Sequence, residues 1–325
     1  NPAASGTVSQ ATLLLDQQGA GPIGLFSTTL YTGNGSTQTI TNDIDLAGEG
    51  GLVWLKDRFS ASLGFHTIYD TEGTGPDGGR IFAGTAGTNG RSTQADGLQS
   101  FDSTGFTLGA NTYENGSGKS FVSWTFRQAT KFFDVVTYTG DGVAGRTVSH
   151  NLGSVPGMII VKKTSDTDFW TVYHRGTDAT SPEDYWLALN GTGAASSGAN
   201  MWNGTAPTST EFTVSAQSNL NGNNSTYVAY LFAHDTDSDS NIKCGSFTTD
   251  GNGDASVDLG FEAQWVLLKR TDGAQSWWLA DTVRGMTAGT SAGTAYLVPD
   301  QSYAEDSTYT NYVNPTSTGF GVDAF

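Results

Sequence analysis

One pattern of strand-forming segments occurs three times along this chain at a nearly constant interval. Each copy contains a run of four apolar residues followed directly by a lysine. These lysines are Lys56, Lys162 and Lys269, which lie about 106 residues apart. An aromatic strand and a Gly-rich turn precede each of these runs. A fixed period of this length constrains the fold more than any single segment, because every copy must form the same substructure.

The last segment of the repeat is present in only two copies. An alternating aromatic strand at residues 121–126 recurs at 227–232, and a third copy would fall at about residue 336, beyond Phe325. The third copy is therefore expected to lack its last strand, which leaves two neighbouring strand edges unpaired. Residues beyond Phe325, a strand of another chain, or the N-terminal segment could fill the gap. We expect one of the first two.

The composition predicts an all-β fold. The 325 residues include 43 Gly and only 14% charged residues, and short apolar runs alternate with Thr, Ser, Asn and Asp without a helical period. About seven strands in roughly 105 residues predict three tandem β-sandwich repeats of jelly-roll type. The boundaries follow from the repeat: 1–24, a candidate attachment arm; 25–130 and 131–240, two complete sandwiches; and 241–325, the incomplete third.

The charge limits the partners. Lys and Arg number 15 against 32 Asp and Glu, a formal net charge of −17. Nucleic acids and anionic membrane surfaces attract basic proteins, so we expect neither as a partner. Cys244 is the only cysteine, so the chain forms no internal disulfide, and we expect this thiol to be a small buried group.

An acidic segment joins the second and third repeats. Asp235, Asp237 and Asp239 alternate along it, and carboxylate oxygens at alternate positions are typical of Ca²⁺-binding loops. The glycine and the final glutamate of an EF-hand loop are missing. The segment is therefore either a solvated acidic linker, which we favour, or a Ca²⁺ site that stiffens the connection.

The long polar loop of the second repeat contains Trp202, and equivalent loops stand at residues 71–98, 190–210 and 286–311. These loops differ more than the strands do, and variable loops on a repeated scaffold often carry recognition. Trp202 is either a glycan contact or, as we favour, a residue that anchors its loop.

No pattern typical of catalysis is found in the sequence. The four histidines are not spaced as metal ligands. Two pairs of neighbouring carboxylates lie in loops, Asp70 with Glu72 and Glu183 with Asp184, but neither pair recurs in the other repeats. We therefore expect no glycosidase centre, and we predict that the protein is not an enzyme.

Six segments considered together carry a resemblance: residues 30–38, 51–56, 121–126, 132–142, 155–162 and 172–175. The chain resembles, over roughly residues 25–325, a family of tandem β-repeat structural proteins in the virions of tailed phages, especially marine and cyanobacterial ones. In that family the third copy ends in a Tyr- and Ile-rich strand followed by Arg, which this chain lacks. The resemblance implies a tail fibre, appendage or surface protein and no catalytic residues.

The repeat and the resemblance together predict a non-enzymatic virion protein on the exterior of the particle. Stacked rigid sandwiches would set its reach, and its loops would contact other virion proteins or a host surface glycan. Copies of the chain would associate, as a trimer in a fibre, and so multiply weak contacts. The alternatives are a capsid decoration or cement protein, and a carbohydrate-binding module or cellular adhesin.

Overall fold

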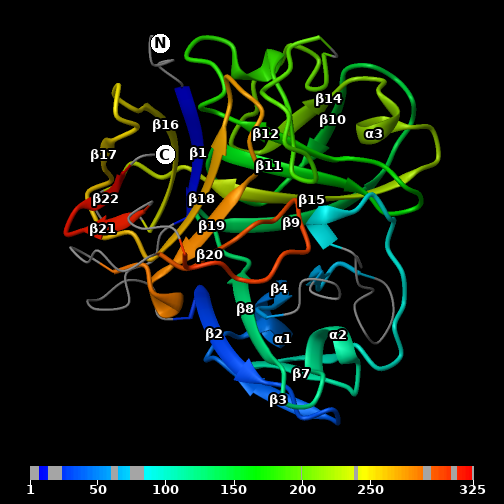
Figure 1. Ribbon diagram of the computed structural model, residues 1–325. Coiled ribbons are helices and arrows are strands. Elements are labelled where there is room, and N and C mark those ends of the chain that lie inside the picture. The colour runs from blue at the N-terminus through cyan, green and yellow to red at the C-terminus, as the bar shows by residue number, and fades with distance from the viewer. Residues whose placement is uncertain are drawn as a thin grey trace.

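The computed structural model describes residues 7–13, 24–59, 65–73, 84–198, 200–237, 241–287, 294–308 and 313–323. Strands make up 42% of the chain and helices 7%, which confirms the predicted all-β fold. The strands form six antiparallel sheets, two for each repeat (Figure 1). None of the helices in the described ranges has the length and apolarity needed to cross a bilayer.

The first repeat pairs a four-stranded sheet with a three-stranded one. The larger sheet has the order β2 (Phe26–Thr32), β8 (Ser120–Arg127), β4 (Gly51–Asp57) and β5 (His66–Asp70). The smaller has the order β3 (Gln38–Thr41), β7 (Gly105–Leu108) and β6 (Leu98–Asp102). The short helices α1 (Leu46–Glu49) and α2 (Thr112–Asn115) and the 3₁₀ turn η1 (Gly84–Ala86) lie in the connections.

The second repeat has the same plan. Its larger sheet has the order β9 (Phe133–Thr139), β15 (Thr226–Ala233), β11 (Pro156–Lys163), β12 (Trp170–His174) and β13 (Leu187–Ala188). Its smaller sheet contains β10 (Arg146–Ser149) and β14 (Glu211–Val214). The 3₁₀ turn η2 (Pro182–Asp184) and the helix α3 (Ser218–Asn221) complete it.

The third repeat takes one strand from the other end of the chain. Its larger sheet has the order β16 (Ile242–Thr248), β1 (Thr7–Leu13), β18 (Trp265–Arg270), β19 (Trp278–Asp281) and β20 (Tyr296–Leu297). Its smaller sheet has the order β17 (Ala255–Asp258), β22 (Gly319–Val322) and β21 (Asn314–Thr316), and η3 (Thr282–Arg284) follows β19. Figure 1 shows β1, in dark blue, between β16 and β18.

The strand β1 occupies the place that β8 and β15 hold in the other two repeats. It pairs with β16 from Thr7↔Thr248 to Leu13↔Ile242, and with β18 from Val8↔Arg270 to Ala11↔Leu267. The expectation that residues beyond Phe325 or another chain must close the third sandwich is therefore wrong. The N-terminal segment, considered above both as a candidate attachment arm and as the third way to fill the gap, contributes a strand whose backbone pairs with both exposed edges.

The Gly-rich turns of the first two repeats are held by one buried asparagine each. Asn115 Oδ1 accepts a hydrogen bond from the backbone N–H of Asn34 at 3.0 Å, and Asn221 Oδ1 accepts one from Asp141 at 3.0 Å. The turns approach the backbone so closely that a Cβ on Gly140 would lie 2.3 Å from the carbonyl oxygen of Gly222. Only glycine fits there, which explains the repeated Gly-rich signature.

The central strands β4 and β18 are covered on both faces. In β4, Leu52 and Trp54 belong to a core shared by all three repeats, whereas Val53 and Leu55 belong to the core inside the first sandwich. The strand β18 repeats this division, with Trp265 and Leu267 in the shared core and Val266 and Leu268 in the third sandwich. Because both faces are buried, these strands are continuous apolar runs rather than alternating ones.

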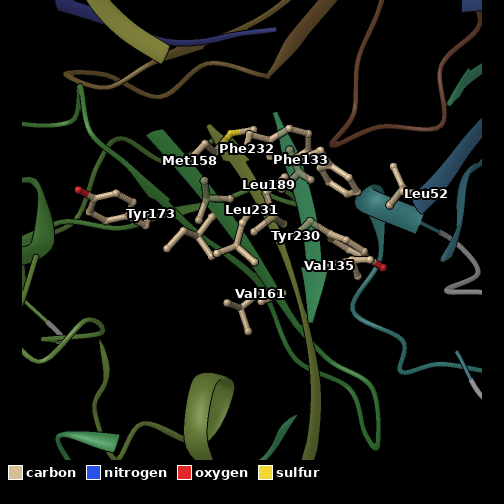
Figure 2. Packing of buried hydrophobic residues seen from close by; sticks show 14 of the residues in the cluster. Leu52, Phe133, Val135, Met158, Val161, Tyr173, Leu189, Tyr230, Leu231 and Phe232 are labelled. Carbon is tan, nitrogen blue, oxygen red and sulfur yellow. The ribbon is translucent and has the colours of Figure 1, made fainter. Parts of the chain in front are cut away.

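The three repeats meet at Phe126. Its ring centroid lies 5.6 Å from that of Phe232 in the second repeat and 5.9 Å from that of Trp265 in the third. Figure 2 shows part of this shared core, with Leu52 of the first repeat beside the apolar side chains of the second. The repeats therefore pack around one centre. The expected row of stacked sandwiches is wrong, because each larger sheet has a second apolar face that needs a neighbour.

Candidate ligand site and the junctions between repeats

The repeated lysine is buried at the end of each central strand. Lys56 and Lys162 are 0% exposed and Lys269 is 1% exposed. Lys162 Nζ donates to the carbonyl oxygens of Lys163 at 2.8 Å and Thr88 at 3.2 Å, and Lys269 Nζ donates to those of Arg270 at 2.9 Å and Thr192 at 3.1 Å. Burial lowers the pKa of each of the three lysines to about 8.

Each long loop reaches the following repeat at the same backbone position. The N–H of Arg91 donates to the carbonyl oxygen of Thr164 at 2.8 Å, and that of Ala195 donates to Thr271 at 2.8 Å. The backbone N–H of Glu305 donates to the carbonyl oxygen of Arg58 at 2.6 Å. Every acceptor stands two residues after a repeated lysine. The first repeat thus contacts the second, the second the third, and the third the first, so the arrangement is a closed ring.

The loops expected to carry recognition therefore also join the repeats. They share the backbone contact but differ in the side chain placed there: Arg91, Ala195 and Glu305. Their sequence differences give each of the three junctions its own chemistry. Residues 74–83, 199, 288–293 and 309–311 of these loops lie outside the described residues, and a recognition role for the loops stays a prediction.

The junction between the third and first repeats is an ionic network that is buried at Arg284 and Asp281 and partly exposed at Arg58 and Glu305. Glu305 accepts from Arg58 Nη2 at 2.6 Å and Nε at 3.0 Å, and from Arg284 Nη1 at 3.1 Å. Arg284 Nε also donates to Asp281 at 2.7 Å, and Trp124 Nε1 donates to the same carboxylate at 3.0 Å. Burial alone would raise the pKa of Glu305, but the two guanidinium groups outweigh it and hold this pKa below its usual value.

A neutral imidazole lies beside this network. His66 stacks on Trp124, with centroids 6.2 Å apart, and its Nδ1 accepts a hydrogen bond from Trp54 Nε1 at 2.8 Å. Burial, followed by the charges of Lys56 and Arg284, holds the pKa of His66 well below 6.5. The side chain is therefore uncharged at neutral pH.

The junction between the first and second repeats contains a buried aspartate and an open cavity. Asp70 is 0% exposed, and its Oδ2 accepts from Arg91 Nη2 at 2.5 Å and from the hydroxyl of Tyr230 at 2.7 Å. A cavity of about 350 Å³ adjoins Arg91. We call it the junction pocket; its lining consists of Glu72, Arg91, Thr137, Tyr138, Thr139, Thr164, Thr226 and Tyr227.

The walls of the junction pocket are held in place from behind. The rings of Tyr138 and Tyr227 stack, with centroids 5.0 Å apart and an interplanar angle of 16°. The Tyr138 hydroxyl donates to the carbonyl oxygen of Leu220 at 2.7 Å, and the Tyr227 hydroxyl donates to that of Ser218 at 2.6 Å. Partial burial, together with the charges of Asp70 and Asp134, raises the pKa of Glu72. The pocket therefore has walls fixed by these hydrogen bonds and one carboxylate in its lining, that of the exposed Glu72.

The acidic segment proposed as a Ca²⁺ site is only partly described. Asp237 Oδ2 lies 2.6 Å from Lys131 Nζ, and both side chains are 54% exposed. Asp235 Oδ1 accepts from the backbone N–H of Asp237 at 3.2 Å. Asp239 lies outside the described residues. Within the described ranges no group of three or more His, Cys, Asp or Glu is placed to hold a metal ion, and Ca²⁺ binding stays a prediction.

Trp202 is buried rather than displayed. Its side chain is 2% exposed, its Nε1 donates to the carbonyl oxygen of Tyr185 at 3.0 Å, and its ring packs edge-on against Tyr173 at 5.7 Å. The assignment of Trp202 as a ligand contact is wrong, because a sugar can stack only on an exposed ring face. The ring anchors its loop, which was the other interpretation. Cys244, 2% exposed, is buried as expected.

The junction pocket has no signature in the sequence. Asp70 and Glu72 are one of the two pairs of neighbouring carboxylates in the sequence. Asp70 accepts hydrogen bonds from Arg91 and Tyr230, whereas Glu72 lines the pocket. The remaining lining residues come from four separate strands and loops. The sequence shows only that Thr137 and Thr139 precede a Gly-rich turn, and threonine beside such a turn is too common in this chain to single out.

A model of one protein family matches residues 22–324, and its description is "Domain of unknown function (DUF7483)". The match spans all three repeats as one domain, in keeping with their shared core. No curated protein and no solved structure matches the chain.

Proposed function

Given that the chain belongs to the DUF7483 family, a domain of unknown function, we propose that it is a non-enzymatic structural and adhesive module on the exterior of a tailed-phage virion. Its context is taken from the resemblance of its repeat segments to virion proteins. Its role is to form a rigid head that presents one surface to a host glycan or to neighbouring virion proteins.

The closed ring of junctions is the observation that carries this proposal. Three backbone contacts of the same kind, at Thr164, Thr271 and Arg58, link the repeats in a circle around one core. A protein that must bear force between a particle and a cell needs contacts that resist separation together. Cyclic packing provides this, since no repeat can leave without breaking two junctions.

Association of several such heads would strengthen attachment. Weak contacts made by each copy combine when the copies are fixed on one particle, as avidity requires. We propose association with further copies of the chain, as a trimer if it forms part of a fibre. Light scattering on the purified protein would measure the mass of the assembly directly.

Gold-conjugated antibody against the purified chain, applied to particles of the phage that encodes it, tests the location. Label on tail appendages is the expected result. Label on the head would favour the capsid decoration alternative, and particles that carry no label would contradict a virion role. Release of reducing ends from a host polysaccharide by the purified chain would contradict the non-enzymatic assignment.

A further inference from the structure

We propose that the junction pocket binds a neutral, hydroxyl-rich saccharide; the inference rests on the proposed adhesive function and names the class of ligand that this function would use. The pocket volume of about 350 Å³ falls at the lower end of the range for small-molecule sites, roughly 300 to 1,000 Å³. It therefore suits about one or two sugar rings rather than a protein segment.

The lining has the hydrogen-bonding groups that sugars need. Thr137 and Thr139 are exposed, and within the described part of the chain no side-chain hydrogen bond engages their hydroxyls. A hydroxyl can donate and accept, as can each hydroxyl of a pyranose. Glu72 adds a carboxylate, and a hydrogen bond to a charged acceptor is stronger than one between neutral groups.

The local charge favours a neutral ligand over an acidic one. The guanidinium of Arg91 is engaged by the buried carboxylate of Asp70, so its charge is balanced inside the protein. The exposed Glu72 then gives the lining of the pocket a negative charge, within a chain whose net charge is −17. A sialic acid or uronic acid carboxylate brought here would meet repulsion.

The pocket is organised before any ligand arrives. Its side walls are the paired strands β9 and β15, in which Tyr138 lies opposite Tyr227, and the hydroxyls of Thr164 and Thr226 lie 2.7 Å apart. Side chains fixed in this way lose little conformational entropy when they bind. Flexible sugar hydroxyls would therefore meet fixed partners, which raises the affinity obtainable from few contacts.

Saturation-transfer NMR and calorimetry with three probes test the inference: cellotriose, the N-acetylglucosamine trimer and sialyl-lactose. We expect saturation transfer from the protein to at least one of the two neutral sugars, and weaker binding of sialyl-lactose. Thr139→Val and Glu72→Ala should each weaken binding of that sugar about tenfold, the loss expected for one good hydrogen bond.

Thr32→Val is the matched control, because Thr32 occupies in β2 the edge position that Thr139 holds in β9. It should leave affinity unchanged. Binding of neither neutral sugar, preference for sialyl-lactose, or equal effects of T139V and T32V would overturn the inference. If gold-conjugated antibody labels the virions but the chain binds no sugar, this inference alone is overturned. If the chain binds sugar but the antibody finds none of it on virions, only the proposed function is overturned.

Discussion

Lys162 Nζ donates a hydrogen bond to the carbonyl oxygen of Thr88, a residue of the preceding repeat, at 3.2 Å. Lys269 makes the equivalent contact with Thr192 at 3.1 Å. A lysine that ends a fully buried strand is thus a structural link between repeats. For Lys162 and Lys269 this explains why a charged residue follows four apolar ones; Lys56 Nζ donates instead to the carbonyl oxygen of Asp57 in its own repeat at 2.6 Å.

These lysines predict an unusual stability profile at alkaline pH. Their pKa values are about 8 in the folded protein and near 10.5 in the unfolded chain, so between these values the unfolded state binds more protons. The free energy of unfolding should therefore rise from pH 8 to pH 10, by roughly 2 kcal/mol per lysine at most. Urea titrations at pH 7.5, 8.5 and 9.5 measure the slope.

Lys162→Met removes one titrating group and should reduce that slope by about a third, since three equivalent lysines share it. A slope unaffected by K162M would contradict the assignment. Above pH 10 the trend should reverse. Burial raises the pKa of Tyr31, Tyr138 and Tyr230 well above 10, so these phenols ionise first in the unfolded chain and stability then falls.

Acid should destabilise the protein through its histidines. Burial lowers the pKa of His66 well below 6.5 and that of His234 to about 4. Below pH 6.5 these histidines bind more protons in the unfolded chain than in the folded one. The free energy of unfolding should therefore fall as the pH drops toward 4. His66→Gln should flatten the profile between pH 6.5 and 5, as chemical denaturation would show. A variant with the full wild-type dependence would exclude His66 as a source.

The ionic junction makes Glu305 critical for stability. Glu305→Ala removes the carboxylate shared by the buried Arg284 and the partly buried Arg58. Breaking a fully buried ion pair costs about 3 to 5 kcal/mol, and because Arg58 is partly exposed and Arg284 keeps Asp281 as a partner, we expect a loss of about 2 to 3 kcal/mol. Glu262, which is exposed, provides the control: Glu262→Ala should change the free energy of unfolding by about 0.5 kcal/mol or less. Equal effects of the two substitutions in urea unfolding would refute the role given to the network.

The strand β1 should hold the third repeat closed. Ala11→Pro removes an N–H from a strand paired on both sides, opposite Cys244 and Leu267, so it should expose the facing edges of β16 and β18. Hydrogen exchange should then show faster exchange of amides in these two strands, with little change in β9 or β15. A synthetic peptide of residues 5–15 should restore protection to a chain lacking residues 1–13. Unchanged protection in A11P would mean that β1 is dispensable.

Local pattern was enough to predict much of the fold. The apolar runs that end in lysine, the aromatic strands and the Gly-rich turns all depend on neighbouring residues, and they predicted the all-β class. Closure of the third repeat by the N-terminal segment was the alternative given least weight, because the pairing of Leu13 with Ile242 joins two segments about 230 residues apart that share no motif.

The candidate site could not be predicted from the sequence, because it too depends on contacts between segments that lie far apart along the chain. Trp202 stands in a polar loop, where an exposed ring and a buried anchor look alike in the sequence, and only packing against Tyr173 distinguishes them. The junction pocket combines Glu72 with Thr139 and Thr226, which come together only when two repeats dock. Docking follows from the second apolar face of each sheet, and the continuous apolar run at residues 158–162, typical of a strand covered on both faces, was the hint in the sequence.

The pairing of β1 with β16 and β18 also sets an order for synthesis. Among the described strands β1 is synthesised first, and Ile242 of its first partner emerges about 230 residues after Leu13. At roughly 5 to 20 residues per second, β1 waits for about 10 to 45 seconds without either partner. Two sandwiches can form meanwhile, but the ring closes last, when translation of the described chain is nearly complete.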